Sequence, residues 1–198
     1  KTYEQHDNEK GSFYKDSIKP FEFSETLESN LDIDICVIGG GLTGISSALN
    51  LAKKGYSIAL CEARTLGWGA SGRNGGQLGI AMRKDQFVIE KRLGFELAKE
   101  LWNLGLEAVN ETTKLISKYN IQCSLQKGVI SAGFSKQKKG DFHYEIEHMQ
   151  KYYNFDGYKF LNKHMIEEEI NTNIYNSGLL NNYNYHLNPL KLLLGLAN

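Results

Sequence analysis

The glycines that follow a short apolar segment near residue 35 constrain the fold of this chain more than any other feature. Gly39, Gly41 and Gly44 stand at G-x-G-x-x-G spacing directly after the β-branched segment 33–38. In such a motif the first glycine allows a sharp turn, the second lets a ligand approach the backbone, and the third lets the next helix pack closely on the strand. The motif predicts a strand, a turn and a helix over 42–54. The N-terminus of this helix would present its free N–H groups to a phosphate.

The residues that follow this motif give it a specific context. A second apolar segment, 57–61, ends in Glu62, which lies 18 residues after Gly44. At this position a carboxylate accepts hydrogen bonds from ribose hydroxyls, and it would repel a 2′-phosphate, which argues against NADP. The order of these features, a strand, the glycines, a helix, a second strand and an acidic residue, predicts a dinucleotide-binding βαβ unit over 33–62. The alternative is a glycine-rich hairpin with a surface glutamate.

A second glycine-rich segment, 63–77, comes directly after the acidic residue. Glycine allows the backbone to approach a flat or phosphorylated ligand closely. A second loop of this kind suits a longer ligand whose far end must also be held, and it therefore favours FAD over NAD. The alternative interpretation is a mobile surface loop, because glycine-rich loops also serve as linkers.

Composition and charge exclude several classes of protein. The 23 basic and 23 acidic residues balance, so bulk charge indicates no nucleic-acid partner. No apolar stretch is long enough to predict a membrane span, and the N-terminal residues include no apolar signal-peptide segment. The spacing of Cys36, Cys61 and Cys123 indicates neither a zinc site nor a disulfide framework. We expect Cys36 and Cys61 to be buried on the two strands, and we expect a reducing, cytoplasmic setting.

The rest of the chain shows weaker patterns. Residues 1–30 are interpreted as an N-terminal arm anchored by aromatic side chains, with a loose tail as the alternative. Between residues 84 and 119 an apolar stripe at helical spacing predicts a core-facing helical segment, and Gly94 and Gly105 are expected to interrupt it. The members of this stripe are Leu93, Leu97, Leu101, Leu104, Ala108, Leu115 and Tyr119.

Beyond residue 120 short strands and helices are expected to alternate. Residues 121–125 and 129–134 are predicted as strands joined by a turn at Lys127 and Gly128. The expected elements after them are a helix over 136–153, a strand over 158–161, a helix over 164–170 and a strand over 178–180 that leads into a loop carrying His186. Asn188 followed by Pro189 is a typical helix start.

The glycine-rich segments, 35–44 and 69–77, resemble those of the FAD-dependent amine and amino-acid oxidoreductases of the D-amino-acid oxidase type. The run 69–77 is most similar to that of the gamma-glutamylputrescine oxidase branch. The resemblance implies an α/β fold, with a Rossmann-like FAD-binding βαβ unit, a helical segment and the start of a mixed α+β substrate domain. The expected division is 1–30 for the arm, 31–120 for the first part of the FAD-binding domain and 121–198 for the first part of the substrate domain. Family members are roughly twice as long, so we expect the chain to be an N-terminal piece.

The resemblance also implies a set of cofactor-binding residues. The first glycine segment would hold the pyrophosphate, Glu62 the adenosine ribose, and Ala63 and Arg64 would lie along the adenine. The alternative for Arg64 is an exposed surface cation. Residues 70–74 would approach the pyrophosphate and ribityl chain, with Arg73 as a phosphate clamp, and 75–77 would lie nearest the isoalloxazine. The complete set is Gly39, Gly41, Leu42, Thr43, Gly44, Glu62, Ala63, Arg64, Ala70, Ser71, Gly72, Arg73, Asn74, Gly75, Gly76 and Gln77. No catalytic acid or base and no metal ligand can be identified.

The activity implied by the resemblance is the oxidation of a small-molecule amine or amino acid to an imine. Hydride would pass to flavin N5, and oxygen, giving peroxide, or another acceptor would take the electrons. A second chain supplying the C-terminal half is the expected partner if that half exists separately. The alternatives are a truncated, non-catalytic dinucleotide-binding module and an NAD enzyme, which the second glycine segment disfavours.

Overall fold

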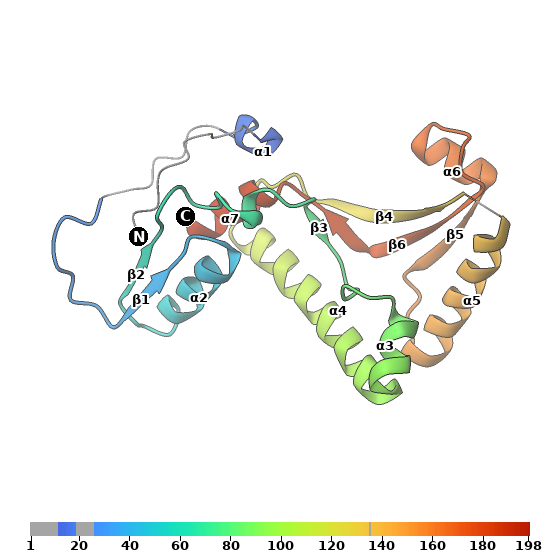
Figure 1. Cartoon of the computed structure of the whole chain (residues 1–198), viewed down its shortest axis with the longest axis horizontal. Coiled ribbons are helices and arrows are strands. Elements are labelled where there is room, and N and C mark those ends of the chain that lie inside the picture. Colours follow the sequence, from blue (N-terminus) through green and yellow to red (C-terminus); the bar gives the residue numbers. More distant parts are fainter. Residues whose placement is uncertain (1–11, 19–25, 135) are drawn as a thin grey trace, which may run out of the picture. The chain divides into compact units, whose positions relative to one another are not determined.

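The computed structural model describes residues 12–18, 26–134 and 136–198, which form two compact units (Figure 1). Unit 1 contains Lys1–Gly76, Leu115–Cys123 and Asn188–Asn198. Unit 2 contains Gln77–Lys114 and Ser124–Leu187. The chain therefore passes between the units several times, whereas the sequence-based division has three consecutive parts, 1–30, 31–120 and 121–198.

Unit 1 is built on a parallel pair of strands, β1 (Ile35–Ile38) and β2 (Ile58–Cys61), connected by helix α2 (Leu42–Ala52). The predicted βαβ order is thus confirmed. Ile45 of α2 packs with Leu60 of β2 in the core of this unit. Gly55 has a φ of 91°, which places the chain reversal after α2 at a residue that tolerates the left-handed region.

The two strand cysteines differ from expectation, because the face of the pair opposite α2 is open. Cys36 is exposed and Cys61 is only half-buried, with their sulfur atoms 4.0 Å apart. Ile38 on the same face is 87% exposed. The burial pattern of β1 alternates with the pleat, as expected for a sheet covered on one face only. The prediction that both thiols are buried is therefore wrong in this structure.

Helix α7 (Pro189–Ala197) completes the core of unit 1. The Asn188 side chain caps it by accepting a hydrogen bond from the Lys191 N–H at 3.0 Å, so the predicted start is confirmed. Leu190 and Leu193 pack against α2, and Asn188 also donates to the Ser17 hydroxyl at 3.0 Å. Ser17 follows the short helix α1 (Phe13–Asp16).

The expected aromatic anchors of the N-terminal arm have different outcomes. Tyr14 packs on the core of unit 1, whereas Phe13 is 80% exposed. Tyr3, Phe21 and Phe23 lie outside the described residues. One aromatic side chain of the arm therefore contacts the core, and the anchoring of the arm by several aromatics stays a prediction.

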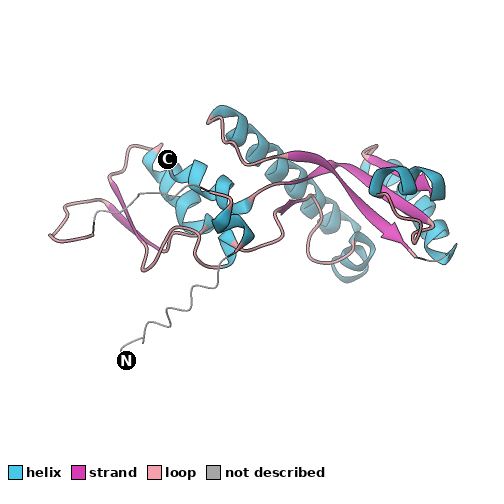
Figure 2. Cartoon of the chain, turned by 90° about the horizontal axis from the view of Figure 1, so that it is seen from above, coloured by secondary structure: helices cyan, strands magenta, loops and turns pink. Residues whose placement is uncertain are grey.

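Unit 2 contains an antiparallel sheet centred on β6 (Ser177–His186), which is visible as the long magenta strands of Figure 2. Its neighbours are β3 (Gln77–Leu78), β4 (Gln126–Gly133) and β5 (Tyr158–Asn162), and all three pair with β6. Helix α5 (Lys136–Tyr153) and helix α6 (Lys163–Ile170) confirm the two predicted helices of this region.

Two strand predictions in unit 2 are wrong. Residues 121–125 form no strand, and β4 begins only at Gln126. The expected turn at Lys127 and Gly128 lies inside β4, where the register with β6 shifts and Gly128 has a φ of 101°. Glycine marks a turn and a β-bulge equally well, so the sequence does not separate the two. Strand β6 also continues to His186, which pairs with Gln77 instead of lying in a loop.

The helical region before β4 has a break at one of the two expected glycines. Gly94, with a φ of 81°, separates α3 (Gln86–Leu93) from α4 (Phe95–Lys118). Gly105 does not interrupt α4. A Cβ at Gly105 would collide with the carbonyl oxygen of Ile80, so this glycine permits close packing inside unit 2.

The most buried face of α4 is not the leucine stripe predicted from the sequence, of which Leu101 and Leu115 are half-buried. Leu97 and Leu104 of this stripe are 46% and 54% exposed, whereas Trp102 is 2% exposed and belongs to the core of unit 2. That core also contains Ile80, Val109, Met149, Tyr153 and Phe155. The leucine stripe and the buried residues of α4, which are Ala98, Trp102, Val109 and Ile116, both have helical spacing, so periodicity alone did not indicate which face packs in the core.

Candidate dinucleotide-binding site

The first glycine segment forms the predicted sharp turn between β1 and α2. Gly39 has a φ of 110°, and its N–H donates to the Cys61 carbonyl at 2.8 Å. A Cβ at Gly44 would collide with the carbonyl oxygen of Gly39. A Cβ at Gly41 would lie 3.0 Å from the Ser71 hydroxyl oxygen. The positive φ of Gly39 and the close contacts at Gly41 and Gly44 account for glycine at these positions, and the expected sharp turn and close helix packing are both present.

The second glycine segment reaches the N-terminus of α2. The Leu42 N–H donates to the Ser71 hydroxyl oxygen at 3.0 Å, across 29 residues of sequence. Gly41 is the N-cap and has no side chain to accept from the free N–H groups of the first turn. The Ser71 hydroxyl, which accepts from Leu42, still has its own proton to donate. The positive end of α2 and this hydroxyl therefore form a place suited to an anion.

Glu62 lies beside this turn and is held by two backbone hydrogen bonds. One carboxylate oxygen accepts from the Gly40 N–H at 2.6 Å and the other from the Arg64 N–H at 2.9 Å. A carboxylate has about four acceptor positions, so roughly two remain for the hydroxyls of a ribose. The backbone thus orients Glu62 without using up its capacity to accept.

Gly40 contacts Glu62 at this turn and was not in the predicted set of cofactor-binding residues. A Cβ there would collide with Leu66 and would lie 3.2 Å from two Glu62 side-chain carbons. Any side chain at this position would therefore displace the carboxylate. The available signal was the uninterrupted run of three glycines, 39–41, of which the motif uses only the first and third.

Two arginines of the second segment gather around Trp68. The guanidinium carbon of Arg64 lies 3.5 Å from the centre of the indole ring, a cation–π arrangement. The Arg73 Nε donates to the Trp68 carbonyl at 2.7 Å. Both arginine side chains are exposed. This places two positive charges on the outer side of the loop, and it gives Trp68 a role that no motif indicated.

Other residues of the second segment shape the loop itself. The Asn74 amide donates to the carbonyls of Ala70 and Ser71 and accepts from the Gly76 N–H at 2.8 Å. These bonds fix the short turn η1 (Ala70–Gly72). A Cβ at Gly72 would collide with the Gly67 carbonyl and lie 3.1 Å from Leu190 of α7. Part of the glycine content therefore serves packing.

The remaining residues of the expected set are less constrained. Thr43 and Ala63 are exposed beside the turn, and nothing lies within 4 Å of a Cβ placed on Gly75. Gln77 begins β3 and belongs to unit 2. The structure thus brings together the residues from 39–44, 62–64 and 70–76 within unit 1 and does not relate Gln77 to them.

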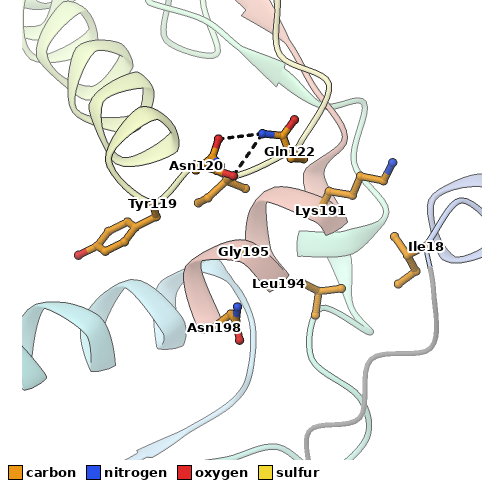
Figure 3. A pocket seen from close by; sticks show the side chains of 9 residues that line it. Ile18, Tyr119, Asn120, Gln122, Lys191, Leu194, Gly195 and Asn198 are labelled. Carbon is orange, nitrogen blue, oxygen red and sulfur yellow. Dashed lines mark hydrogen bonds between the residues drawn. The ribbon is translucent and has the colours of Figure 1, made fainter.

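Unit 1 also has a shallow cavity of about 330 Å³ beside the end of α7, shown in Figure 3. Lys191 is its one charged lining residue, and Gln122 donates to the Asn120 side chain at 2.9 Å. None of the residues predicted to bind a cofactor lines this cavity. Among the described residues there is also no cluster of three potential metal ligands and no helix that could cross a membrane.

Comparison with known proteins identifies the class of fold and the family. Residues 34–198 match the family described as FAD dependent oxidoreductase. The chain is 33% identical over 186 residues to gamma-glutamylputrescine oxidoreductase of Escherichia coli K12, covering 94% of this chain and 43% of that protein. It is also 33% identical over 189 residues to a probable oxidoreductase of Haemophilus influenzae, with the same coverage.

Solved structures show the same fold at lower identity. L-amino acid deaminase from Proteus vulgaris superposes with a TM-score of 0.66 at 17% identity, covering 88% of this chain and 44% of that one. Glycine oxidase from Bacillus cereus gives a TM-score of 0.59 at 20% identity, covering 84% and 44%. The chain belongs to the FAD dependent oxidoreductase family and spans about 43% of the length of the curated relatives that it matches. FAD is the cofactor of this family, and the turn, the Glu62 carboxylate and the Ser71 hydroxyl fit it.

Proposed function

We propose that unit 1 holds the adenosine diphosphate part of FAD in an enzyme that oxidises an amine or amino acid. The observation that carries the proposal is the meeting of both glycine segments at the N-terminus of α2, through the Leu42–Ser71 hydrogen bond of 3.0 Å. A single long cofactor explains why the segment after Glu62 returns to the first turn. A dinucleotide held by the first segment alone would not need this return.

Each group has a distinct part in the proposed binding. The N-terminus of α2 and the Ser71 hydroxyl would hold the pyrophosphate, because unpaired N–H groups and the helix dipole favour an anion. Glu62 would accept from the ribose hydroxyls. Arg64, stacked on Trp68, would lie along the adenine, and Arg73 would approach the phosphates. The residues 75–77 would lie nearest the isoalloxazine.

The proposed reaction is the oxidation of the bond between a carbon and an amine nitrogen. Bound FAD supplies the acceptor for the hydride from that carbon, and oxygen or another acceptor reoxidises it. The substrate is proposed to be a small amine by analogy with the gamma-glutamylputrescine oxidoreductase that the chain resembles. Unit 2 is proposed as the first part of the substrate domain. Polypeptide outside this chain would supply the substrate-recognising residues, in a second chain if it exists separately.

A second candidate is a dinucleotide-binding module without catalysis. It is favoured by the chain's coverage of 43% of its curated relatives, which leaves more than half of their length unmatched. An NAD-binding function is disfavoured because the second glycine segment contacts the first.

FAD titration of the purified chain tests the binding proposal. We expect the wild-type chain to bind FAD in preference to NAD, with fluorescence of the flavin as the readout. Glu62→Gln should weaken FAD binding about tenfold, because a neutral amide accepts ribose hydroxyls less strongly than a carboxylate. Glu28→Gln, at an exposed position before β1, is the matched control. Equal affinity for NAD, or no effect of Glu62→Gln, contradicts the proposed site.

Catalysis is tested separately from binding. Peroxide release, or reduction of an artificial electron acceptor, is measured with FAD and a panel of amines and amino acids. Turnover of any of them supports the oxidase. FAD binding without bleaching of the flavin by any substrate supports the non-catalytic module.

A further inference from the structure

A cavity of about 320 Å³ lies within unit 2, on the helix-covered face of the antiparallel sheet. Its floor is formed by Ser131 and Val129 of β4 and by Leu179 and Asn181 of β6, which are paired across the strands. Its walls come from α3, α4 and α5, with Tyr158 of β5 at one side. The volume is within the range of small-molecule sites and about ten times that of one water molecule.

Two acidic side chains line the cavity, and none of its described lining residues is basic. Asp85 and Glu145 are its two charged lining residues. Asp85 caps α3 by accepting from the Phe87 N–H at 2.9 Å, and the Glu145 carboxyl is hydrogen-bonded to the Tyr158 hydroxyl. Among the side chains that the structure describes, no lysine or arginine forms an ion pair with either carboxylate. Burial and the nearby Asp85 raise the pKa of the Glu145 carboxyl above its ordinary value.

A second, independent observation is the indole N–H of Trp102. This side chain lines the cavity and is 2% exposed, yet its Nε1 finds no hydrogen-bond acceptor among the described residues. Buried indole N–H groups normally have a partner, and leaving one without a partner costs about 1–3 kcal/mol. A ligand that carries an acceptor would satisfy this donor.

The two asparagines of the cavity are fixed in orientation by the backbone. The Asn184 side-chain oxygen accepts from the Ile80 N–H at 3.0 Å, and that of Asn181 accepts from the Tyr183 N–H at 2.8 Å. Their NH₂ groups are the donors that remain on these side chains. The cavity therefore offers two carboxyl groups as acceptors and a few uncharged hydrogen-bond donors.

The aromatic lining distinguishes an organic cation from a metal ion. Trp102, Phe142 and Tyr158 line the cavity with aromatic rings, a type of group that attracts ammonium ions. Calcium and magnesium instead need a shell of six or more oxygen ligands, and among the described residues no group of three candidate ligands occurs. Val129 and Leu179 add apolar surface suited to a short alkyl chain.

We propose that this cavity binds a small alkylammonium ion that carries a hydrogen-bond acceptor, with its ammonium group at Glu145 and Asp85 and its acceptor at Trp102. The binding does not depend on FAD, so it stands apart from the proposed function of unit 1.

Isothermal titration of the purified chain with 4-aminobutan-1-ol tests the proposal. This probe has one ammonium group, a four-carbon chain and a hydroxyl that can accept from the indole. The neutral isostere 1,4-butanediol and magnesium chloride are the comparison ligands. We expect saturable binding of the amine and at least tenfold weaker binding of the diol and of Mg²⁺. Absence of saturable amine binding, as in a cavity filled only with water, overturns the proposal, and so does equal binding of the diol or preferential binding of Mg²⁺.

Substitutions at the lining residues test whether the amine binds in this cavity. Glu145→Gln keeps the shape of the side chain and removes its charge, and it should weaken binding of the amine about tenfold or more. Glu147→Gln on the exposed side of the same helix is the matched control and should change nothing. If Glu145→Gln does not fold by circular dichroism, Asp85→Asn is used instead, because asparagine is also a good helix cap. An unchanged affinity in the variant used would overturn the proposal.

The fluorescence of Trp102 gives a second readout. The chain has two tryptophans, so Trp68→Phe leaves Trp102 as the single indole emitter. Binding of 4-aminobutan-1-ol should shift this emission with the same midpoint as the titration. Saturable binding without a change in Trp102 emission would place the amine elsewhere and overturn the assigned site.

Discussion

The proposed dinucleotide site of unit 1 and the cavity of unit 2 are built in opposite ways. The first depends mainly on backbone groups and on glycine, with Glu62 and Ser71 as side-chain partners, in two nearby windows of sequence, 39–44 and 62–76. The second uses longer side chains from three helices and three strands between Ala81 and Asn184. A site made from backbone requires glycine at fixed spacing, and that requirement is visible in a sequence. A site made from side chains depends on which faces the fold brings together.

The largest effect that we expect is the difference in stability between substitutions on the two faces of α4 in unit 2. Trp102→Ala should lower the free energy of unfolding by about 3–5 kcal/mol, because it removes a large buried ring from the core. Leu97→Ala, on the 46% exposed side of the same helix, should change it by no more than about 0.5 kcal/mol. Urea denaturation followed by circular dichroism measures both. Equal losses would mean that the leucine stripe is covered as fully as the face of Trp102.

The second prediction concerns the backbone-built site. Gly44→Ala should lower the free energy of unfolding by about 3 kcal/mol, because the added Cβ would collide with the Gly39 carbonyl. FAD affinity should fall by roughly a hundredfold as the turn moves. Gly69→Ala is the control, since nothing lies within 4 Å of its Cβ, and it should retain FAD binding. Retained FAD binding in Gly44→Ala would show that the turn is not held by close packing.

The same contrast explains which parts of the fold were predictable. The βαβ unit, the Asn188 cap and the break at Gly94 follow from local requirements on φ or on hydrogen bonding, and all three were predicted correctly. The errors arose where one local pattern fits two tertiary settings. Gly128 fits a turn and a bulge, and the Leu97 and Trp102 faces share the same helical period. Cys36 was expected to be buried because cysteine on a parallel strand is usually a buried small residue, whereas the strand pair of unit 1 is covered on one face only.

The candidate site shows the same limit. The glycine spacing and the acidic residue after β2 were visible in sequence, whereas the stacking of Arg64 on Trp68 was not, because stacking depends on side-chain directions in a loop. Gly40 was missed because the motif permits any residue between the first two glycines, although the nearby Leu66 and Glu62 do not. For the cavity of unit 2, no spacing links Asp85, Trp102 and Glu145.

A smaller effect is expected from the cap of α7, which tests how much this helix stabilises unit 1. Asn188→Ala removes the acceptor for the Lys191 N–H and the donor to Ser17. The free energy of unfolding should fall by about 1 kcal/mol, the usual value for an N-cap. Asn188→Asp keeps the capping oxygen and should recover most of this loss. If Asn188→Ala is neutral by urea denaturation, the cap does not contribute to the stability of unit 1.

The smallest effect expected is a pH dependence from the carboxyl of Glu145 in unit 2. Burial, and then repulsion by Asp85, raise its pKa in the folded state, and the hydrogen bond from Tyr158 opposes this only partly. A carboxyl with a raised pKa binds more protons when folded than when unfolded, so its contribution to stability is lost as pH rises from its unfolded pKa through its folded pKa. In the Glu145→Gln variant this position does not titrate. The stability of the variant relative to wild type should therefore increase with pH across this window, measured by urea denaturation at a series of pH values. Parallel curves for the two proteins would mean that the Glu145 carboxyl is as well solvated in the folded chain as in the unfolded chain. Glu145 would then not be a buried acidic group of the cavity, and the contrast with the backbone-built site of unit 1 would rest on Asp85 alone.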